Sequence, residues 1–254
     1  MFFSSNVEMK IYSIIVTIAL VLSLFSLCGI GVRTGYFRGV MIKFGILPPL
    51  EHSVYPDNYL DGIPVMQRMT EKGWENCLRQ MNTKCDIVFY GNSITANGCW
   101  MDWFPEYSIC NLGLSGDNLQ GLKRRIRMVV CLKPSKVFVM GGINGIKDIS
   151  YSDFYEQYSD LCHVMIDSMP NAKIVLQSML PIDSSRFDDY APNYKIDSCN
   201  RIIEKLAIQY NLTFVDLYPY YIELQKQEQI YIDGIHLKKE YYRYWVEKIK
   251  VYLE

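Results

Sequence analysis

Short apolar runs alternate with longer amphipathic segments along the second two-thirds of the chain. The apolar runs are Asp86–Tyr90, Tyr107–Leu112, Lys136–Met140, Lys173–Met179 and Leu212–Leu217. Between and after them, apolar residues recur with helical period over residues 117–132, 151–168, 194–210, 218–229 and 238–253. Short buried strands that alternate with helices are typical of a parallel sheet with both faces covered. The pattern predicts a doubly wound, flavodoxin-like three-layer α/β/α domain with a five-stranded parallel sheet.

A different pattern occupies the N-terminal end. Ile11 to Val32 contains no charged side chain, and as a helix these residues would span about 33 Å, enough for the hydrocarbon core of a bilayer. The apolar region of a signal peptide is shorter, about 7–15 residues. We therefore expect residues 1–32 to hold an uncleaved transmembrane anchor, with a cleaved or lipidated signal segment as the alternative.

Residues 33–63 are rich in Gly, Pro and Tyr and show no sustained period. They are predicted to form a juxtamembrane linker, which leaves residues 64–254 for the α/β domain. Arg33, Arg38 and Lys43 follow the apolar segment in the sequence, on the same side as the α/β domain, and Lys10 precedes the segment. By the positive-inside rule, these charges favour a cytoplasmic α/β domain.

Composition and charge exclude several classes of function. The formal net charge is −1, so there is no electrostatic reason to expect nucleic acid as a partner. No two of the eight cysteines have C-x-x-C spacing, and the chain is too long to need a disulfide scaffold, so most cysteines are expected to be buried small hydrophobic residues. His52 and His163 are isolated, which argues against a zinc site.

Polar, glycine-bearing loops follow three of the predicted strands, and a fourth precedes the last predicted helix. These loops are Gly91-Asn92-Ser93-Ile94-Thr95, Gly113-Leu114-Ser115-Gly116-Asp117-Asn118, Gly141-Gly142-Ile143-Asn144-Gly145 and Asp233-Gly234-Ile235-His236-Leu237. In a doubly wound fold, the ligand lies beyond the carboxyl ends of the strands. We therefore expect the four loops to converge on one site.

The loops carry the residue types that nucleophilic catalysis requires. A serine such as Ser93 becomes reactive only when a base removes its proton, and His236 is the one histidine on a loop of this kind. Asp233 stands three residues earlier, where its carboxylate can fix the imidazole tautomer. The main-chain N–H groups of Ser93 and Gly116 and the side-chain amide of Asn144 are candidate donors to an oxyanion.

In these motifs the chain resembles the SGNH (GDSL-type) hydrolase superfamily. The blocks GNSIT, NLGLSGDN, GGING and DGIHL fall in the family's order over about residues 86 to 237. The resemblance implies Ser93 as nucleophile, Gly116 and Asn144 in the oxyanion hole, and Asp233 with His236 as the rest of a triad. Two positions depart from the family pattern: Asn92 replaces the usual Asp before the serine, and Gly145 replaces the usual Asp after the asparagine.

The resemblance implies a serine esterase that works through an acyl-enzyme without metal or organic cofactor. We expect the substrate to be a small-molecule or polysaccharide ester, with a small acyl group such as acetyl on a carbohydrate favoured. Lipid or long-chain esters, acyl transfer to a sugar hydroxyl and a catalytically silent binding domain remain alternatives. Family analogy favours an extracytoplasmic catalytic domain, against the flanking charges. The sequence does not predict the oligomeric state.

Two clusters have simpler interpretations. Lys123, Arg124, Arg125 and Arg127 are expected to form a solvated helix face, with an anionic-ligand patch as the alternative. The aromatic residues that follow the candidate nucleophile are expected to pack in the core, with a sugar subsite as the alternative. They are Trp100, Trp103, Phe104 and Tyr107.

Overall fold

A computed structural model describes residues 84–187 and 191–253, which form an α/β domain around one parallel sheet. Its strands are β1 (Ile87–Gly91), β2 (Ile109–Gly113), β3 (Lys136–Met140), β4 (Lys173–Gln177) and β5 (Thr213–Val215). All neighbouring strands pair in parallel, in the order β2-β1-β3-β4-β5. This is the flavodoxin-like order, so the predicted five-stranded parallel sheet is confirmed.

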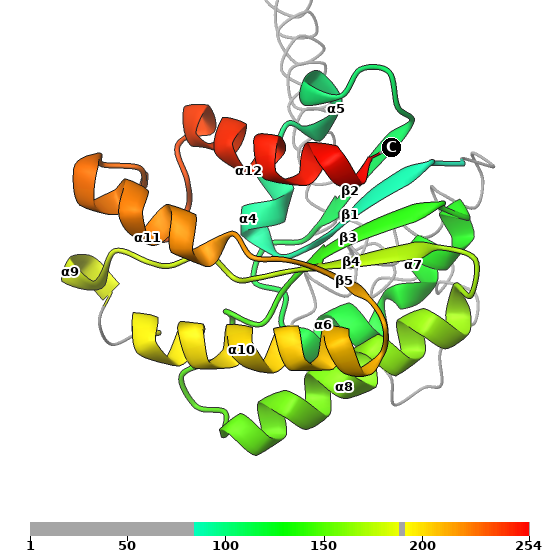
Figure 1. The fold of residues 1–254 in the computed structure, drawn as a ribbon, viewed down its shortest axis with the longest axis horizontal. Coiled ribbons are helices and arrows are strands. Elements are labelled where there is room, and N and C mark those ends of the chain that lie inside the picture. Colours follow the sequence, from blue (N-terminus) through cyan, green and yellow to red (C-terminus); the bar gives the residue numbers. More distant parts are fainter. Residues whose placement is uncertain (1–83, 188–190, 254) are drawn as a thin grey trace, which may run out of the picture. The chain divides into compact units, whose positions relative to one another are not determined.

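Helices cover both faces of this sheet (Figure 1). On one face lie α4 (Ser93–Ala96), α11 (Tyr218–Gln227) and α12 (Tyr242–Ile249). On the opposite face lie α6 (Leu119–Arg124), α8 (Tyr151–Ser168) and α10 (Asn193–Gln209). The shorter elements are α5 (Trp100–Trp103), α7 (Ile126–Leu132), α9 (Ser184–Phe187) and the 3-10 turns η2 (Lys239–Tyr241) and η3 (Lys250–Tyr252).

Two of the predicted helices are interrupted. The segment 117–132 divides into α6 and α7 at Arg125, whose backbone leaves the helical region with φ −97° and ψ 15°. The segment 238–253 is an α-helix only at its centre, with 3-10 turns at both ends. The three other segments match α8, α10 and α11 to within two residues at each end, because each has an apolar face to bury on the sheet or on its neighbours.

Aromatic side chains fill the core behind the carboxyl end of β1. The Phe89 ring stacks on Trp100 at a centroid distance of 4.0 Å and on Phe138 at 5.1 Å. Trp100 also meets Trp245 of α12 edge-on. Trp100 and Phe104 are buried, and Trp103 and Tyr107 pack against the core, as predicted for this cluster.

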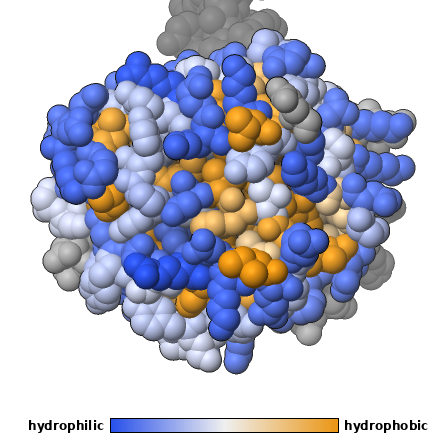
Figure 2. Space-filling view, viewed as in Figure 1, coloured by the Kyte–Doolittle hydropathy of each residue, from blue (hydrophilic) through white to orange (hydrophobic). Residues whose placement is uncertain are grey.

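In Figure 2, apolar residues gather near the centre of the face that is shown, and hydrophilic residues surround them.

The structure contains a disulfide that the sequence pattern does not predict. Cys85 and Cys110 form a disulfide between the residue that leads into β1 and the neighbouring strand β2. Parallel pairing places Val88 beside Cys110, so cysteines far apart in the sequence meet at a position that spacing alone does not reveal. Cys162 and Cys199 are free and buried, as expected, whereas Cys99 and Cys131 are free and half-buried.

None of the helices formed by residues 84–187 and 191–253 is both long and apolar enough to cross a membrane. The predicted anchor, Ile11 to Val32, lies outside the described residues, as do the linker at 33–63 and His52.

Candidate active site

The structure brings Ser93, His236 and Asp233 together at the carboxyl edge of the sheet. Ser93 is the first residue of α4 and is separated from the end of β1 only by Asn92, whereas His236 precedes the last helices. The distance from Ser93 Oγ to His236 Nε2 is 2.8 Å, and that from His236 Nδ1 to Asp233 Oδ2 is 2.6 Å. When Nδ1 donates to the carboxylate, Nε2 is left as an acceptor for the serine proton.

Asp233 is held as a carboxylate by the turn that contains His236. Its Oδ1 accepts hydrogen bonds from the main-chain N–H of Ile235 at 3.0 Å and of His236 at 2.8 Å. Partial burial alone would raise the pKa of Asp233, but the hydrogen bonds from the His236 main chain and imidazole and from Ile235 outweigh it and lower the pKa to about 2. The group that orients the imidazole is therefore ionised at neutral pH.

The sequence explains how the candidate nucleophile is presented. Asn92 caps α4, and its Oδ1 accepts from the N–H of Ile94 at 3.0 Å. This cap ends the strand and starts the helix within one residue, which leaves Ser93 half-buried at the helix start. The Nδ2 atom of Asn92 is buried and has no hydrogen-bond partner among the described residues.

The other end of α4 is fixed from β2. The side-chain amide of Asn111 donates to the carbonyl oxygens of Thr95, Ala96 and Gly98 at 3.0–3.1 Å. The helix approaches β2 so closely that a Cβ at Gly113 would lie 2.2 Å from the main-chain nitrogen of Ala96. Glycine is therefore required at the end of β2, and its contacts place the candidate nucleophile firmly.

The candidate oxyanion donors lie on the loops after β2 and β3. Gly116 has φ +77°, in the left-handed region that favours glycine, and its Cα faces open space. Asn144 is half-buried, and its Nδ2 donates to the main-chain carbonyl of Asp117 at 2.7 Å. Gly145 has φ +85°, a conformation that favours glycine, at the position where the SGNH pattern has an aspartate.

Arg125 is a site residue that sequence reasoning missed. It was expected on a solvated basic face, but its side chain is 2% exposed and Nε lies 2.6 Å from Oδ2 of the fully buried Asp117. Lys123 does follow expectation, as an exposed partner of Asp160. A signal was present in the sequence, because Arg125 stands three residues after Leu122 and four before Val129, both buried, and so falls on the apolar stripe.

The guanidinium of Arg125 joins the ends of two strands below the loops. Nη1 donates to the carbonyl of Leu112 at 2.7 Å and Nη2 to that of Gly91 at 2.8 Å. The carbon of the guanidinium lies 4.4 Å from the centre of the Tyr90 ring. Such a planar group with three acceptors in place is strongly oriented, and it fixes the β1 and β2 loops relative to each other.

Solved structures share this fold at low sequence identity. A GDSL-like lipase from Bacteroides thetaiotaomicron has 23% identity and a TM-score of 0.59, over 72% of this chain and 96% of that one. A lipase/acylhydrolase from Enterococcus faecalis has 24% identity and a TM-score of 0.56, over 65% and 95%. A mutant of an acetyl-xylooligosaccharide esterase from Geobacillus stearmophilus has 22% identity and a TM-score of 0.53, over 66% and 93%.

A search of curated proteins finds no match to the chain. A family model does match it, over residues 89–244, which include the three catalytic candidates and both oxyanion candidates. This match covers more than half of the sequence. The chain belongs to the GDSL-like lipase/acylhydrolase family, a family of carboxylic ester hydrolases.

Proposed function

We propose that the protein hydrolyses its ester through an acyl-enzyme on Ser93, with His236 as general base and Asp233 as the group that orients it. The observation that carries this proposal is the continuous hydrogen-bond path of 2.8 Å and 2.6 Å from the serine hydroxyl to the carboxylate. Nucleophile, base and orienting group within such distances are the signature of an activated serine.

In the first half of the reaction, Ser93 Oγ attacks the ester carbonyl carbon while its proton passes to His236 Nε2. The imidazolium then gives this proton to the departing alkoxide, and the acyl group stays on Ser93. In the second half, water attacks the acyl carbon and gives a proton to Nε2, which returns it to Ser93 Oγ as the carboxylic acid leaves. Asp233, ionised at neutral pH, stabilises the imidazolium in both halves.

Both tetrahedral intermediates place a negative charge on the former carbonyl oxygen. We assign its stabilisation to the main-chain N–H groups of Ser93 and Gly116 and to the side-chain amide of Asn144. The positive φ of Gly116 and the hydrogen bond of Asn144 to the Asp117 carbonyl support this assignment, because both groups are oriented before any substrate binds.

For the substrate, we propose a small acyl group, such as acetyl, on a carbohydrate hydroxyl. The likeness to an acetyl-xylooligosaccharide esterase supports this choice at the level of the fold.

We propose further that residues 11–32 anchor the protein in a membrane with the catalytic domain on the extracytoplasmic side. The Cys85–Cys110 disulfide supports this side, since structural disulfides persist in oxidising compartments.

The reaction is tested on the full chain in detergent, with a fluorophosphonate probe and p-nitrophenyl acetate. The expected result is labelling and acetate release by the wild type, and neither by Ser93→Ala or His236→Ala. A folded wild type that is neither labelled nor active would contradict the proposal and favour a binding domain.

Product analysis with an added sugar acceptor separates hydrolysis from acyl transfer. Labelling of intact cells with a maleimide reagent that does not cross membranes tests on which side of the membrane the catalytic domain lies.

A further inference from the structure

A pocket of about 370 Å³ opens between α6, α8 and the loop that carries Asn144. Its volume is within the range of small-molecule sites. The lining residues are Asn118, Leu119, Gln120, Gly142, Asn144, Gly145, Asp148, Ile149, Asp153, Phe154, Glu156 and Gln157. Asn144 belongs both to this lining and to the proposed oxyanion hole, so the pocket borders one of the proposed oxyanion donors.

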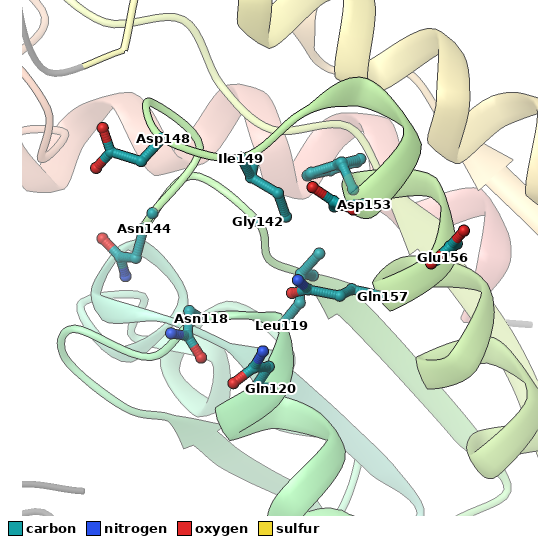
Figure 3. Close-up of a pocket in the computed structure, with 12 residues that line it drawn as sticks. Asn118, Leu119, Gln120, Gly142, Asn144, Asp148, Ile149, Asp153, Glu156 and Gln157 are labelled. Atoms are coloured by element: carbon teal, nitrogen blue, oxygen red, sulfur yellow. The ribbon is translucent and has the colours of Figure 1, made fainter. Parts of the chain in front are cut away.

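Four of the residues that line the pocket carry side-chain carboxamides. Figure 3 shows that Gln120 of α6 and Gln157 of α8 reach into the same space, with Asn118 and Asn144 on the adjoining loops. The amides of Gln120 and Gln157 make no hydrogen bond to any described residue. Each amide offers two donors and one acceptor oxygen, so this lining can bind hydroxyl groups that donate as well as accept.

Apolar surface completes the pocket. Leu119 and Phe154 are buried and Ile149 is half-buried. A sugar ring presents C–H groups on its faces and hydroxyl groups around its edge. Apolar side chains combined with a few positioned polar groups are the general composition of a small-molecule site, and this combination is complementary to such a ring.

The charges of the pocket have one sign. Asp148, Asp153 and Glu156 line it, and no lysine or arginine is among the lining residues. Asp153 accepts a hydrogen bond from Ser150 at 2.7 Å, whereas Asp148 and Glu156 form no ion pair with any described residue. Like charges repel across a few ångströms even in water, so a phosphate, sulfate or carboxylate group on the substrate is disfavoured here.

We propose that this pocket is a subsite for an uncharged sugar ring of the ester substrate, and that its carboxylates discriminate against anionic sugars. Gln120 and Gln157 bind the ring hydroxyls, and Asp148 and Glu156 supply the discrimination. The inference rests on the proposed function, because the pocket serves as a subsite only if Asn144 borders the reacting carbonyl.

The charge selection is tested on the full chain with two acetylated methyl glycosides, a xyloside and a glucuronide, which carry the same acetyl positions and differ by the carboxylate. We expect the wild type to prefer the xyloside. In Asp148→Asn with Glu156→Gln, the ratio of kcat/KM for glucuronide over xyloside should rise about fivefold to tenfold, and the rise should shrink in high salt. The control Glu204→Gln with Glu247→Gln removes the same charge from exposed positions elsewhere and should leave the ratio unchanged.

The sugar contacts are tested by Gln120→Leu with Gln157→Leu. We expect the ratio of kcat/KM for the xyloside to kcat/KM for p-nitrophenyl acetate to fall about tenfold. The control Gln227→Leu with Gln229→Leu changes two exposed residues and should leave this ratio unchanged. If the wild type cleaves p-nitrophenyl acetate and either ratio fails to move, or moves equally in the controls, the subsite is refuted and the esterase stands. If the wild type is not labelled by fluorophosphonate and cleaves none of the esters, the proposed function itself has failed.

Discussion

The carboxylate of Asp117 and the guanidinium of Arg125 form an ion pair of 2.6 Å that is withdrawn from solvent, and the main-chain carbonyl of the same Asp117 accepts the side-chain amide of Asn144 at 2.7 Å. One residue therefore connects a buried cation to a proposed oxyanion donor. Breaking a buried ion pair leaves an uncompensated charge, which is costly. The pair also fixes the peptide group on which the orientation of Asn144 depends.

Arg125→Lys keeps the positive charge but removes the planar fork that serves Asp117, Leu112 and Gly91. We expect the free energy of unfolding to fall by about 3 kcal/mol. We also expect kcat for p-nitrophenyl acetate to fall by about 10-fold or more with little change in KM, because the lost contact acts on the transition state. Urea unfolding and steady-state kinetics measure the two effects, and Arg127→Lys on the exposed face of α7 is the control.

If Arg125 acts by orienting Asn144, the effects of substituting the two residues on kcat should not be additive. In an Asn144→Ala background, Arg125→Lys should lower kcat much less than it does in the wild type, because the group that it orients is already gone. Equal losses in both backgrounds would assign Arg125 to stability alone.

Asn144→Ala removes one proposed oxyanion donor. We expect kcat to fall by about 10²–10³-fold, and the free energy of unfolding to change by only about 1 kcal/mol, because the position is half-buried and the hydrogen bond to the Asp117 carbonyl is between neutral groups. Asn200→Ala is the matched control. Asn200 is buried and bonds both main-chain groups of Met179, so its loss should destabilise the protein without lowering kcat of the folded fraction. A wild-type rate in Asn144→Ala would remove Asn144 from the mechanism.

Asp233→Asn should lower kcat by about 10³–10⁴-fold, because an amide cannot stabilise the imidazolium or fix the same tautomer. The pKa of Asp233 is lowered to about 2 in the folded protein, against about 4 in the unfolded chain. Its charge therefore stabilises the fold fully above about pH 4, and this contribution is lost as the pH falls toward 2.

The free energy of unfolding should accordingly differ between wild type and Asp233→Asn by a constant amount between about pH 4 and pH 5. Below about pH 4 this difference should shrink. It should not exceed about 1 kcal/mol, since about half of the Asp233 side chain is exposed and solvent screens the interaction. Urea titrations between pH 2 and 5 measure it. A difference that grows as the pH falls would contradict the low pKa.

The sequence was sufficient to predict the sheet and the convergence of the four loops, because both follow from local patterns. The run Lys136–Met140 became a strand with the predicted bounds, and the bounds of the other four strands differ from the predicted runs by at most two residues at either end. Parallel strands bring their carboxyl ends to one edge. Asp233 and His236 share one short turn, so their contact also depends on local chemistry. The 2.8 Å approach of His236 to Ser93 spans 143 positions. Its prediction depends on the convergence of the loops at the carboxyl edge of the sheet and on the residue types that these loops carry.

What the sequence did not reveal depends on contacts between distant residues. Arg125 lies among basic residues in the sequence, but its burial is determined by Asp117 and by the carbonyls that end β1 and β2. The Cys85–Cys110 disulfide depends on the register of two strands. The pocket that borders Asn144 is lined by residues of both α6 and α8, and no local sequence pattern connects these two helices.

Asn92 offers a last test, because only one of its two polar side-chain atoms has a partner. Oδ1 caps α4 through the N–H of Ile94, whereas Nδ2 is buried and unpaired among the described residues. Asn92→Asp keeps the capping oxygen and removes a buried donor without a partner, which is costly to retain. It introduces a buried charge in exchange, at a helix start where negative charge is favoured.

We therefore expect Asn92→Asp to change stability by less than about 1 kcal/mol and kcat by less than about fivefold. Asn92→Leu has a similar volume but no capping oxygen. It should cost about 0.5–2 kcal/mol of stability and lower kcat by about 10²-fold, because the start of α4, and Ser93 with it, is displaced. Urea unfolding and the rate of fluorophosphonate labelling measure both variants. Equal losses in the two would show that the amide nitrogen, rather than the cap, is what the site requires.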